Sequence, residues 1–248
     1  MPARINTSSK AAVIAVLGFP ALIAVVIAGC AARFNHPPNA QTPDASLLRL
    51  QKGSQFKYVG TLEWSVGTNI SRTNIDWVME VVDVVKGERA EAAIVRGFLG
   101  NLAWHEPNME PGFTIIAREG NRVYQFPCDD ESRARAQAEK IASDGVDSNA
   151  EVWLDLPLSN GKRWAFDPAR ADLWYCWYIE DEELRTYAAP GLPTHEKART
   201  WTVVYRSAPD HQIFKIAEGV GIVGYEYGHH GTVASAKVAL SGMKTARD

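Results

Sequence analysis

Residues 56–66 read Phe-Lys-Tyr-Val-Gly-Thr-Leu-Glu-Trp-Ser-Val, and this stretch decides the fold class. Its large apolar side chains recur at even positions, from Phe56 to Val66, while lysine, threonine, glutamate and serine stand between them. A period of two is that of a β-strand with one buried and one exposed face. The stretch therefore predicts a half-buried antiparallel strand.

The same signal returns at short intervals along the chain. Residues 75–81 alternate in the same way, and residues 114–118 and 122–126 predict a hairpin around Gly120-Asn121. Further strands are expected at residues 90–97, 152–156, 174–179, 200–206, 212–217, 221–227 and 232–240. These eleven short strands, with one short helix among them, predict a mainly β fold, a curved antiparallel sheet forming a half-barrel or open barrel.

One stretch predicts a short helix. Asp129 or Asp130 can cap it, alanines and charged residues fill positions 131–142, and Gly145 can end it. Because its apolar stripe is narrow, we expect the helix to lie at the edge of the sheet. The acidic run at 180–183 is expected to form a solvated turn or loop, since neighbouring carboxylates repel one another.

The first thirty residues carry the pattern of a secretory signal. Arg4 and Lys10 precede a run of uncharged residues that ends in Ile27-Ala28-Gly29-Cys30. This ending resembles the lipobox of bacterial lipoproteins, in which the cysteine is acylated and becomes the first residue of the mature protein. A transmembrane anchor is the alternative, because the apolar run reaches the lower limit for a membrane span. Pro20 and the small residues before the cysteine favour cleavage and lipidation at Cys30.

Cleavage would divide the chain into a signal peptide at 1–29, a flexible tether at 30–46 and a single β-rich domain at 47–244. The tether is rich in proline and asparagine and has little apolar surface to bury. Ala31, rather than an aspartate, follows the cysteine, so the resemblance implies an outer-membrane lipoprotein that faces the periplasm. The lipid anchor makes the membrane the first expected partner.

Charge and cysteine content narrow the function classes. The mature chain keeps 24 Lys and Arg against 29 Asp and Glu, a net charge of −5, which gives no electrostatic footprint for nucleic acid. Cys128 and Cys176 are the cysteines left after lipidation, and in an oxidising periplasm they predict a disulfide. Two buried, unpaired thiols are the alternative, and two thiolates without a nearby histidine do not predict a metal site.

A glycine motif suggests nucleotide binding, but its context is wrong. Residues 219–224 read Gly-Val-Gly-Ile-Val-Gly and match the dinucleotide fingerprint. The residues that follow alternate like a strand, whereas the third glycine of that fingerprint must open a helix. We interpret the glycines as a turn, a bulge or a close approach of strands, and we expect no cofactor.

The histidines raise the possibility of a zinc or acid–base site. His211, His229 and His230 lie near Asp210 and Glu226 in the sequence. Adjacent residues of a strand point to opposite faces, so His229 and His230 are not expected to share a metal ion. No nucleophile elbow of the form Gly-x-Ser-x-Gly is present either. We therefore expect no metal and no catalytic residues, with a His-dependent hydrolase as the minor alternative.

Three segments together resemble uncharacterised bacterial envelope lipoproteins and the half-barrel families of the LolA and LolB lipoprotein carriers. They are the strands at 58–64 and 75–81, the phrase Leu-Pro-Leu-Ser-Asn-Gly-Lys-Arg-Trp at 156–164, and the glycine-rich ending at 219–232 with its tyrosines and histidines. The resemblance implies a concave antiparallel sheet and brings no catalytic residues with it. The cysteine pair and the helix at 130–145 do not belong to that pattern.

The function expected from the sequence is a non-enzymatic, tethered periplasmic protein whose concave face binds a lipid, another apolar ligand or an envelope component. The alternation places a set of large side chains on that face: Tyr58, Leu62, Trp64, Trp77 and Met79. An accessory lipoprotein that binds an envelope protein partner is the alternative. A carrier should show a deep groove, an accessory protein a flat exposed apolar patch, and an enzyme clustered histidine and carboxylate side chains.

Overall fold

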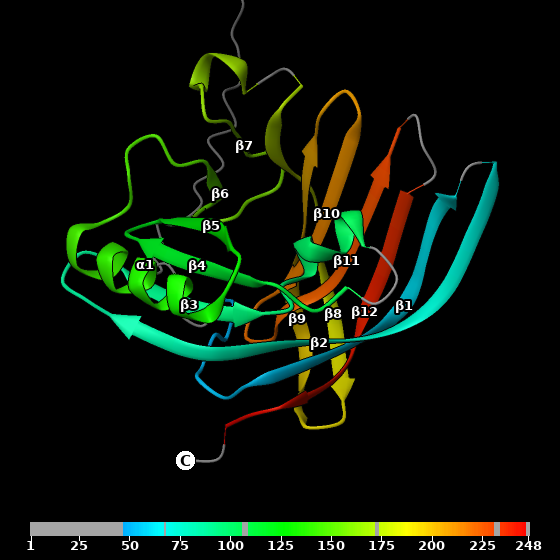
Figure 1. The fold of residues 1–248 in the computed structure, drawn as a ribbon, viewed down its shortest axis with the longest axis horizontal. Helices are drawn as coiled ribbons and strands as arrows, with labels where there is room; N and C mark the ends of the chain where they lie inside the picture. The colour runs from blue at the N-terminus through cyan, green and yellow to red at the C-terminus, as the bar shows by residue number, and fades with distance from the viewer. Residues whose placement is uncertain (1–46, 67, 106–108, 172–173, 231–233, 247–248) are drawn as a thin grey trace, which may run out of the picture. The chain divides into compact units, whose positions relative to one another are not determined.

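Twelve β-strands form one antiparallel sheet in the part of the chain that the structure, a computed structural model, describes (Figure 1). The described residues are 47–66, 68–105, 109–171, 174–230 and 234–246, so Cys30, the signal and almost all of the tether lie outside them. The chain divides into two compact units, Met1–Ala40 and Gln41–Asp248, and every described residue belongs to the second. No helix within the described ranges is long and apolar enough to cross a membrane.

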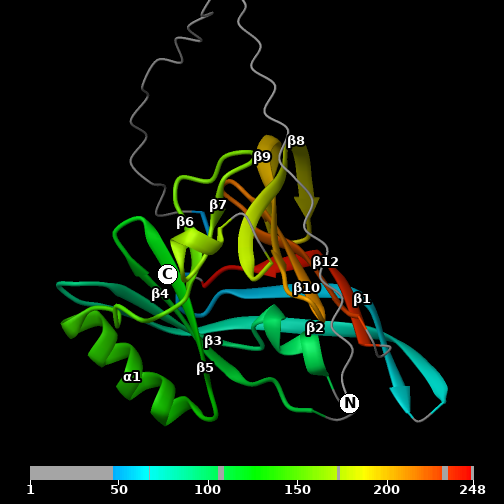
Figure 2. The ribbon, with the colours of Figure 1, turned by 90° about the horizontal axis from the view of Figure 1, so that it is seen from above.

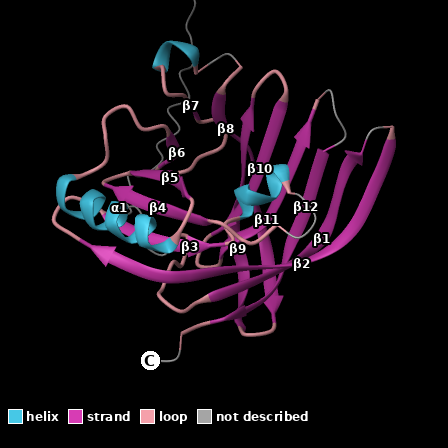
Figure 3. Ribbon diagram, in the orientation of Figure 1, coloured by secondary structure: helices cyan, strands magenta, loops and turns pink. Residues whose placement is uncertain are grey.

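The elements follow one another along the chain with few helices between the strands (Figure 3). The strands are β1 (Gln55–Val66), β2 (Asn69–Lys86), β3 (Glu91–Arg96), β4 (Phe113–Glu119), β5 (Arg122–Cys128), β6 (Val152–Asp155), β7 (Arg163–Trp164), β8 (Cys176–Ala189), β9 (Leu192–Arg206), β10 (Asp210–Ala217), β11 (Gly221–His229) and β12 (Ala234–Lys244). The helices are α1 (Glu131–Asp144) and two short 3₁₀ helices, η1 (Leu99–Trp104) and η2 (Pro168–Arg170).

The sheet is nearly closed into a barrel with one seam. Its strand order is β6-β5-β4-β3-β2-β1-β12-β11-β10-β9-β8-β7, so β1 and β12 pair in the middle and β6 and β7 face each other across the seam. Side chains bridge the seam: Trp164 Nε1 donates to the Val152 carbonyl at 3.1 Å, and Lys162 forms an ion pair with Asp155 at 3.3 Å. At Gly60 the backbones of β1 and β12 approach so closely that a Cβ would lie 1.9 Å from the Lys237 carbonyl oxygen.

The lumen of this sheet holds the main hydrophobic core. The connection between β3 and β4 returns inward as η1, which contacts β11 and β12. Its Leu99 and Leu102 are buried, and the Phe98 ring before it stacks on Phe214 with the centroids 5.8 Å apart. Residues of β11 and β12 therefore pack against η1, which comes from the connection between β3 and β4.

Helix α1 lies on the outside of the sheet, against β3 and β4 (Figure 2). Asp130 caps it by accepting a hydrogen bond from the Arg133 amide at 2.9 Å, and Gly145 ends it with a positive φ of 92°. Ala134, Ala138 and Ile141 pack on the outward-facing apolar residues of the two strands. The helix thus covers a face of the sheet, whereas the sequence had suggested its edge.

The structure confirms the mainly β fold with a curved antiparallel sheet, and it corrects a second local expectation. The acidic run at 180–183 is part of β8 and not a loop. Arginines offset the repulsion between its carboxylates: Arg206 lies 3.7 Å from Glu180, Arg199 lies 3.5 Å from Glu182, and Arg185 lies 2.6 Å from Glu183. Two of the three arginines come from β9, so only the strand pairing reveals them.

Candidate functional site

The inner face of the sheet is hollow at two places, one at each end of β4. Thr114, Ile116 and Arg118 share that face because side chains of a strand alternate. Thr114 borders one cavity, which we call the wide cavity, and the other two residues border a second, smaller one, which we call the leucine pocket. The two cavities therefore lie at opposite ends of the same strand.

The wide cavity has a volume of about 320 Å³ and aromatic walls. Phe98 precedes η1, Trp153 comes from β6 and Trp177 from β8. The lining therefore combines residues from both sides of the seam with a residue next to η1. Behind it lies Phe214, fully buried, whose ring centroid is 5.2 Å from that of Trp153 and 6.1 Å from that of Trp177. Such contacts fix the orientation of the wall.

Polar groups between these rings have unused hydrogen-bonding capacity. The side-chain amides that border the cavity are Asn101, Gln125 and Gln212. Asn101 Oδ1 and the indole Nε1 of Trp153 are both buried, and neither has a hydrogen-bond partner among the described residues. A buried polar group without a partner costs about 1–3 kcal/mol. The other indole is satisfied, because Trp177 Nε1 donates to Glu151 Oε1 at 3.3 Å.

Asp210 has two side-chain partners where β10 begins and β11 ends, two residues before Gln212 of the cavity. Asp210 Oδ1 accepts hydrogen bonds from the Tyr227 hydroxyl and from His229 Nδ1, each at 2.7 Å. Burial acts to raise the pKa of Asp210, but the hydrogen bonds from His229 and Tyr227 outweigh it, so the pKa lies below its ordinary value. An ionised carboxylate only accepts, so His229 Nδ1 carries a proton and donates it to Asp210.

His230 and His211 meet on the other side of the same two strands. His211 Nδ1 lies 3.3 Å from His230 Nε2, while His229 faces Asp210. The two adjacent histidines thus have separate partners, as the strand period predicts. Burial, then the neighbouring His230 and Arg206, lower the pKa of His211. Within the described residues no group of three or more His, Cys, Asp or Glu side chains is arranged to hold a metal ion.

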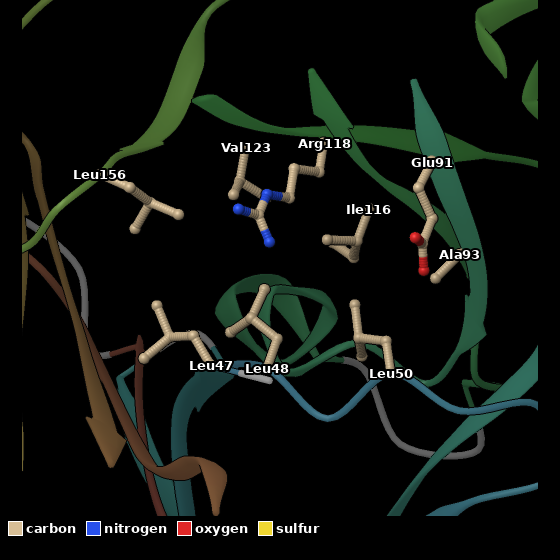
Figure 4. A pocket seen from close by; sticks show the side chains of 9 residues that line it. All are labelled: Leu47, Leu48, Leu50, Glu91, Ala93, Ile116, Arg118, Val123 and Leu156. Atoms are coloured by element: carbon tan, nitrogen blue, oxygen red, sulfur yellow. The ribbon is translucent and has the colours of Figure 1, made fainter. Parts of the chain in front are cut away.

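The leucine pocket lies at the end of the lumen where the described chain begins (Figure 4). It has a volume of about 70 Å³, and Leu47, Leu48 and Leu50 form one side of it. Arg118 extends over these leucines, and its Nε donates to the Gly120 carbonyl at 3.2 Å. Glu91 stands directly opposite Arg118 in the pairing of β3 with β4. Apolar side chains of the chain itself therefore fill most of this end.

The five residues that the sequence assigns to a ligand surface lie in or beside the core. Tyr58, Leu62, Trp77 and Met79 are each no more than 5% exposed, and Trp64 packs against them half-buried. Tyr58 donates to the Ile222 carbonyl at 2.9 Å and Trp77 Nε1 to the Gly97 carbonyl at 2.7 Å. The closing of the sheet and the inward turn of η1 cover the face that the alternation left open. None of these five side chains borders the wide cavity.

The structure does not show the disulfide predicted between Cys128 and Cys176, so this pairing stays a prediction. Cys128 ends β5, where its Sγ lies 3.6 Å from Gln137 Oε1 under α1. Cys176 begins β8 and is buried with Tyr178 and Val204 in another cluster. Cys30, the predicted lipidation site, lies outside the described residues.

Sequence reasoning missed the residues of the wide cavity. Asn101 lies in η1, Gln125 in β5 and Gln212 in β10, so no spacing pattern connects them. The glycine motif at 219–224 behaves as interpreted: Gly219 in the turn before β11 and Gly221 at its start have positive φ values of 71° and 102°, and the bulge in the pairing of β10 with β11 lies beside Gly224.

No family model matches the chain, and no curated protein matches it. Among solved structures, it is similar to a putative lipoprotein from Parabacteroides distasonis, with 10% identity, a TM-score of 0.36, and coverage of 80% of this chain and 98% of that one. It is also similar to a putative exported protein with a YmcC-like fold from Bacteroides fragilis, with 11% identity, a TM-score of 0.36, and coverage of 79% and 97%. At these TM-scores neither likeness carries an argument about function.

Proposed function

We propose that the chain is a non-enzymatic lipoprotein of the bacterial envelope, acylated at Cys30, whose folded domain binds a small ligand in the wide cavity. The observation that carries the binding function is a cavity of about 320 Å³ bordered by three side-chain amides, a carboxylate and buried aromatic rings. Ligand sites combine such apolar walls with a few convergent polar groups. The sequence before Leu47 supports the tether, the outer membrane and the periplasm as its setting.

The anchoring is tested separately from the binding. Cells that express the wild-type chain should incorporate labelled palmitate into it, and the protein should fractionate with membranes. The Cys30→Ala variant should lose the label, while Cys128→Ala should keep it and serve as the matched cysteine control. Label that persists in Cys30→Ala would refute the acylation.

A cavity-filling variant tests the binding. Gln125→Trp places a large ring among the walls of the wide cavity, and Arg122→Trp places the same ring at an exposed position of the same strand. The wild-type protein and the Arg122→Trp control should retain a co-purifying small molecule, detected by mass spectrometry of the denatured protein, and Gln125→Trp should lose it. Extracts of wild-type protein that contain no such molecule, together with no ligand-induced change in spectra, would overturn the binding function.

An exposed aromatic loop favours a second function, the binding of an envelope protein. Phe166, Trp174 and Tyr175, all between β7 and β8, are 60%, 58% and 45% exposed. Exposed aromatic side chains that gather in one place are typical of interaction surfaces. Partner capture that Phe166→Ala and Trp174→Ala abolish together, while Gln125→Trp leaves it intact, would establish this function instead.

The Asp210–His229 pair is interpreted as structural. A carboxylate that orients a histidine resembles part of a hydrolytic triad. Asp210 of β10, however, accepts hydrogen bonds from both Tyr227 and His229 of β11, so it links the two strands. The Ser207 hydroxyl is engaged with the Asp210 backbone amide at 3.0 Å in the same turn. His229→Gln should therefore leave any esterase background unchanged, and hydrolysis that this variant abolishes would revive the enzyme alternative.

A further inference from the structure

We propose that the outer face of the sheet carries a second ligand site, which binds an organic anion with one negative charge and a short apolar part. The site is a hollow of about 520 Å³ between the end of the β8–β9 hairpin and strands β10, β11, β12 and β1, which we call the outer groove. None of the described residues that line the wide cavity borders it. The inference therefore goes beyond the proposed function and does not depend on it.

Strand pairing forms the floor of the outer groove. A row of residues crosses four paired strands: Lys215 of β10, Gly224 of β11, Ala239 of β12 and Val59 of β1. Their neighbours Phe214, Tyr225 and Val238 belong to the core of the lumen, so the row faces outward. Glycine and alanine leave the middle of the row low. Opposite the floor, the Met243 amide of β12 donates to the Pro190 carbonyl at the hairpin tip at 2.8 Å and holds the hairpin in place.

The charged side chains of the outer groove leave one positive charge unbalanced. Those among its described lining residues are Arg185, Lys215, Lys237 and Glu226. Glu226 Oε1 lies 3.1 Å from Lys237 Nζ and 3.8 Å from Lys215 Nζ, so one carboxylate serves two ammonium groups. Arg185 pairs at 2.6 Å with Glu183, which does not border the groove. A ligand with a single negative charge would balance the remaining cation.

The size of this charge distinguishes between classes of anion. A carboxylate or a phosphodiester carries one negative charge at neutral pH, whereas a phosphate monoester carries about 1.5 to 2. Each ammonium group has three N–H donors, so Lys215 and Lys237 both keep at least two that Glu226 does not use. Hydrogen bonds from such charged donors to an anion are stronger than those between neutral groups. The groove therefore matches a carboxylate or a phosphodiester better than a phosphate monoester.

The groups that would contact the ligand are accessible from solvent. The side chains of Lys237 and Lys215 are 72% and 35% exposed, and that of Arg185 is about half exposed. Val59 and Ala239 are exposed as well and place apolar surface beside the ammonium groups. The volume falls within the range of about 300–1,000 Å³ that is typical of ligand sites. An anion with a short apolar part can thus use both kinds of surface.

The test uses the whole chain, purified in a non-ionic detergent, and short probes that stay outside the micelles: hexanoate, diethyl phosphate, inorganic phosphate and hexyltrimethylammonium. Titrations followed by saturation-transfer NMR should show saturable binding of hexanoate, of diethyl phosphate or of both, and none of the ammonium probe. Tighter binding of hexanoate would identify a carboxylate as the bound group, and tighter binding of diethyl phosphate a phosphodiester. Inorganic phosphate should displace the bound probe only at higher concentration.

Variants of the lining locate the binding. Lys215→Met and Lys237→Met should each weaken it about fivefold, the effect of one exposed ion pair. Glu226→Gln should strengthen it, because the competing carboxylate is removed. Ala239→Trp should abolish it by filling the floor.

Matched controls should leave the binding unchanged. Lys57→Met removes an exposed ammonium group of β1 outside the groove, and Val78→Trp places the same ring at an exposed position of β2. Gln125→Trp, which fills the wide cavity, should have no effect either.

Three outcomes would overturn the inference. Binding that persists undiminished in both lysine variants or in Ala239→Trp would place the anion elsewhere on the chain. Binding that Gln125→Trp abolishes would place it in the wide cavity. Absence of binding for both singly charged anions, or tighter binding of inorganic phosphate or the ammonium probe, would exclude the proposed class of ligand. The proposed function is tested separately, by the co-purifying molecule that Gln125→Trp should lose.

Discussion

The two ends of the lumen share strands β4 and β5, but side chains fill one end and leave the other open. At the leucine pocket, three leucines from the start of the described chain fill the space and leave about 70 Å³. At the wide cavity, about 320 Å³ stays open, and two of the lining residues, Asn101 and Trp153, each have a buried polar atom without a partner among the described residues. Filling an apolar space stabilises a fold, whereas an open space with unsatisfied polar groups destabilises it. The comparison indicates that the leucine end stabilises the fold, and the wide end is where we propose that a ligand binds.

The same contrast holds for the carboxylates near each end. Asp83 binds Lys52, which follows the leucines, and Arg135 of α1, so two cations surround it. Asp210, two residues before Gln212 of the wide cavity, has a tyrosine and a histidine instead. Asp83 therefore joins the first residues of the domain and the outer helix to β2, and Asp210 joins β10 to β11.

The largest effect is expected from breaking the support behind the wide cavity. Phe214→Ala removes a fully buried ring that contacts Phe98, Trp153 and Trp177, and should lower the free energy of unfolding by about 3–5 kcal/mol. Urea denaturation of the purified domain measures it. Phe166→Ala, at a 60% exposed position, should stay within about 0.5 kcal/mol. Equal effects of the two variants would show that Phe214 is not packed as described.

A smaller loss is expected at the leucine end. Leu47→Ala removes a side chain that is 7% exposed, and should lower the free energy of unfolding by about 2 kcal/mol because the space cannot collapse around the missing methyl groups. Leu184→Ala, at a 65% exposed position of β8, is the matched control and should change little. If Leu47→Ala did not change the free energy of unfolding, the leucines before β1 would not stabilise the fold by filling this end of the lumen.

Lowering the pH should remove the stability that the ionised Asp83 contributes. Hydrogen bonds from Lys52 and Arg135 lower the pKa of Asp83 to about 2, from an ordinary value of 3.8. The stability contributed by a group with a lowered pKa is present above its unfolded pKa and is lost as the pH falls. We expect a loss of about 1–2 kcal/mol between pH 4 and pH 2, discounted because Lys52 and Arg135 are largely exposed.

The matched variant for the acid experiment is Asp83→Asn. Its unfolding free energy at pH 7 should be lower than that of the wild type, and the difference should shrink as the pH approaches 2. A difference that stays constant across this range would assign the effect to packing and not to the charge of Asp83.

The smallest effect on stability is expected at the wide cavity. Asn101→Leu replaces an amide whose oxygen is buried without a partner by an apolar group of similar size. Stability should stay unchanged or rise by up to about 1 kcal/mol, since the unsatisfied acceptor is removed. Thermal unfolding without ligand is the measurement. A clear loss of stability would mean that Asn101 is structural and that the wide end is not organised for binding.

Sequence patterns predict the parts of this fold that depend on local preferences. The alternation in residues 56–66 and the Asp130 and Gly145 ends of α1 are local signals, and all three appear in the structure. The first residues of β2 and the facing extensions of β8 and β9 carry polar side chains on both faces, so pairing and not burial makes them strands, and the alternation gives no sign of them.

The candidate site escaped prediction for a related reason. Helix η1 has no side-chain cap and is only six residues long, yet its entry into the lumen decides which inner-face residues are covered and which border a cavity. Asn101, Gln125 and Gln212 come together only through the register of strands far apart in the sequence. The sequence alone contains no pattern that predicts that these three residues lie close together.

The pairing of β1 with β12 gives the chain a ring-like connectivity. Every strand neighbours the next one in sequence except at the seam, and the last strand returns to the first. Gly53 and Ala246, just outside these two strands, approach so closely that a Cβ on Gly53 would lie 3.2 Å from the Ala246 Cβ. A circular permutant that joins these ends with a short linker and opens between β6 and β7 would run as one uninterrupted meander from β7 to β6. The present termini are therefore one choice among equivalent positions on a ring, and that choice sets where along the ring a tether can leave.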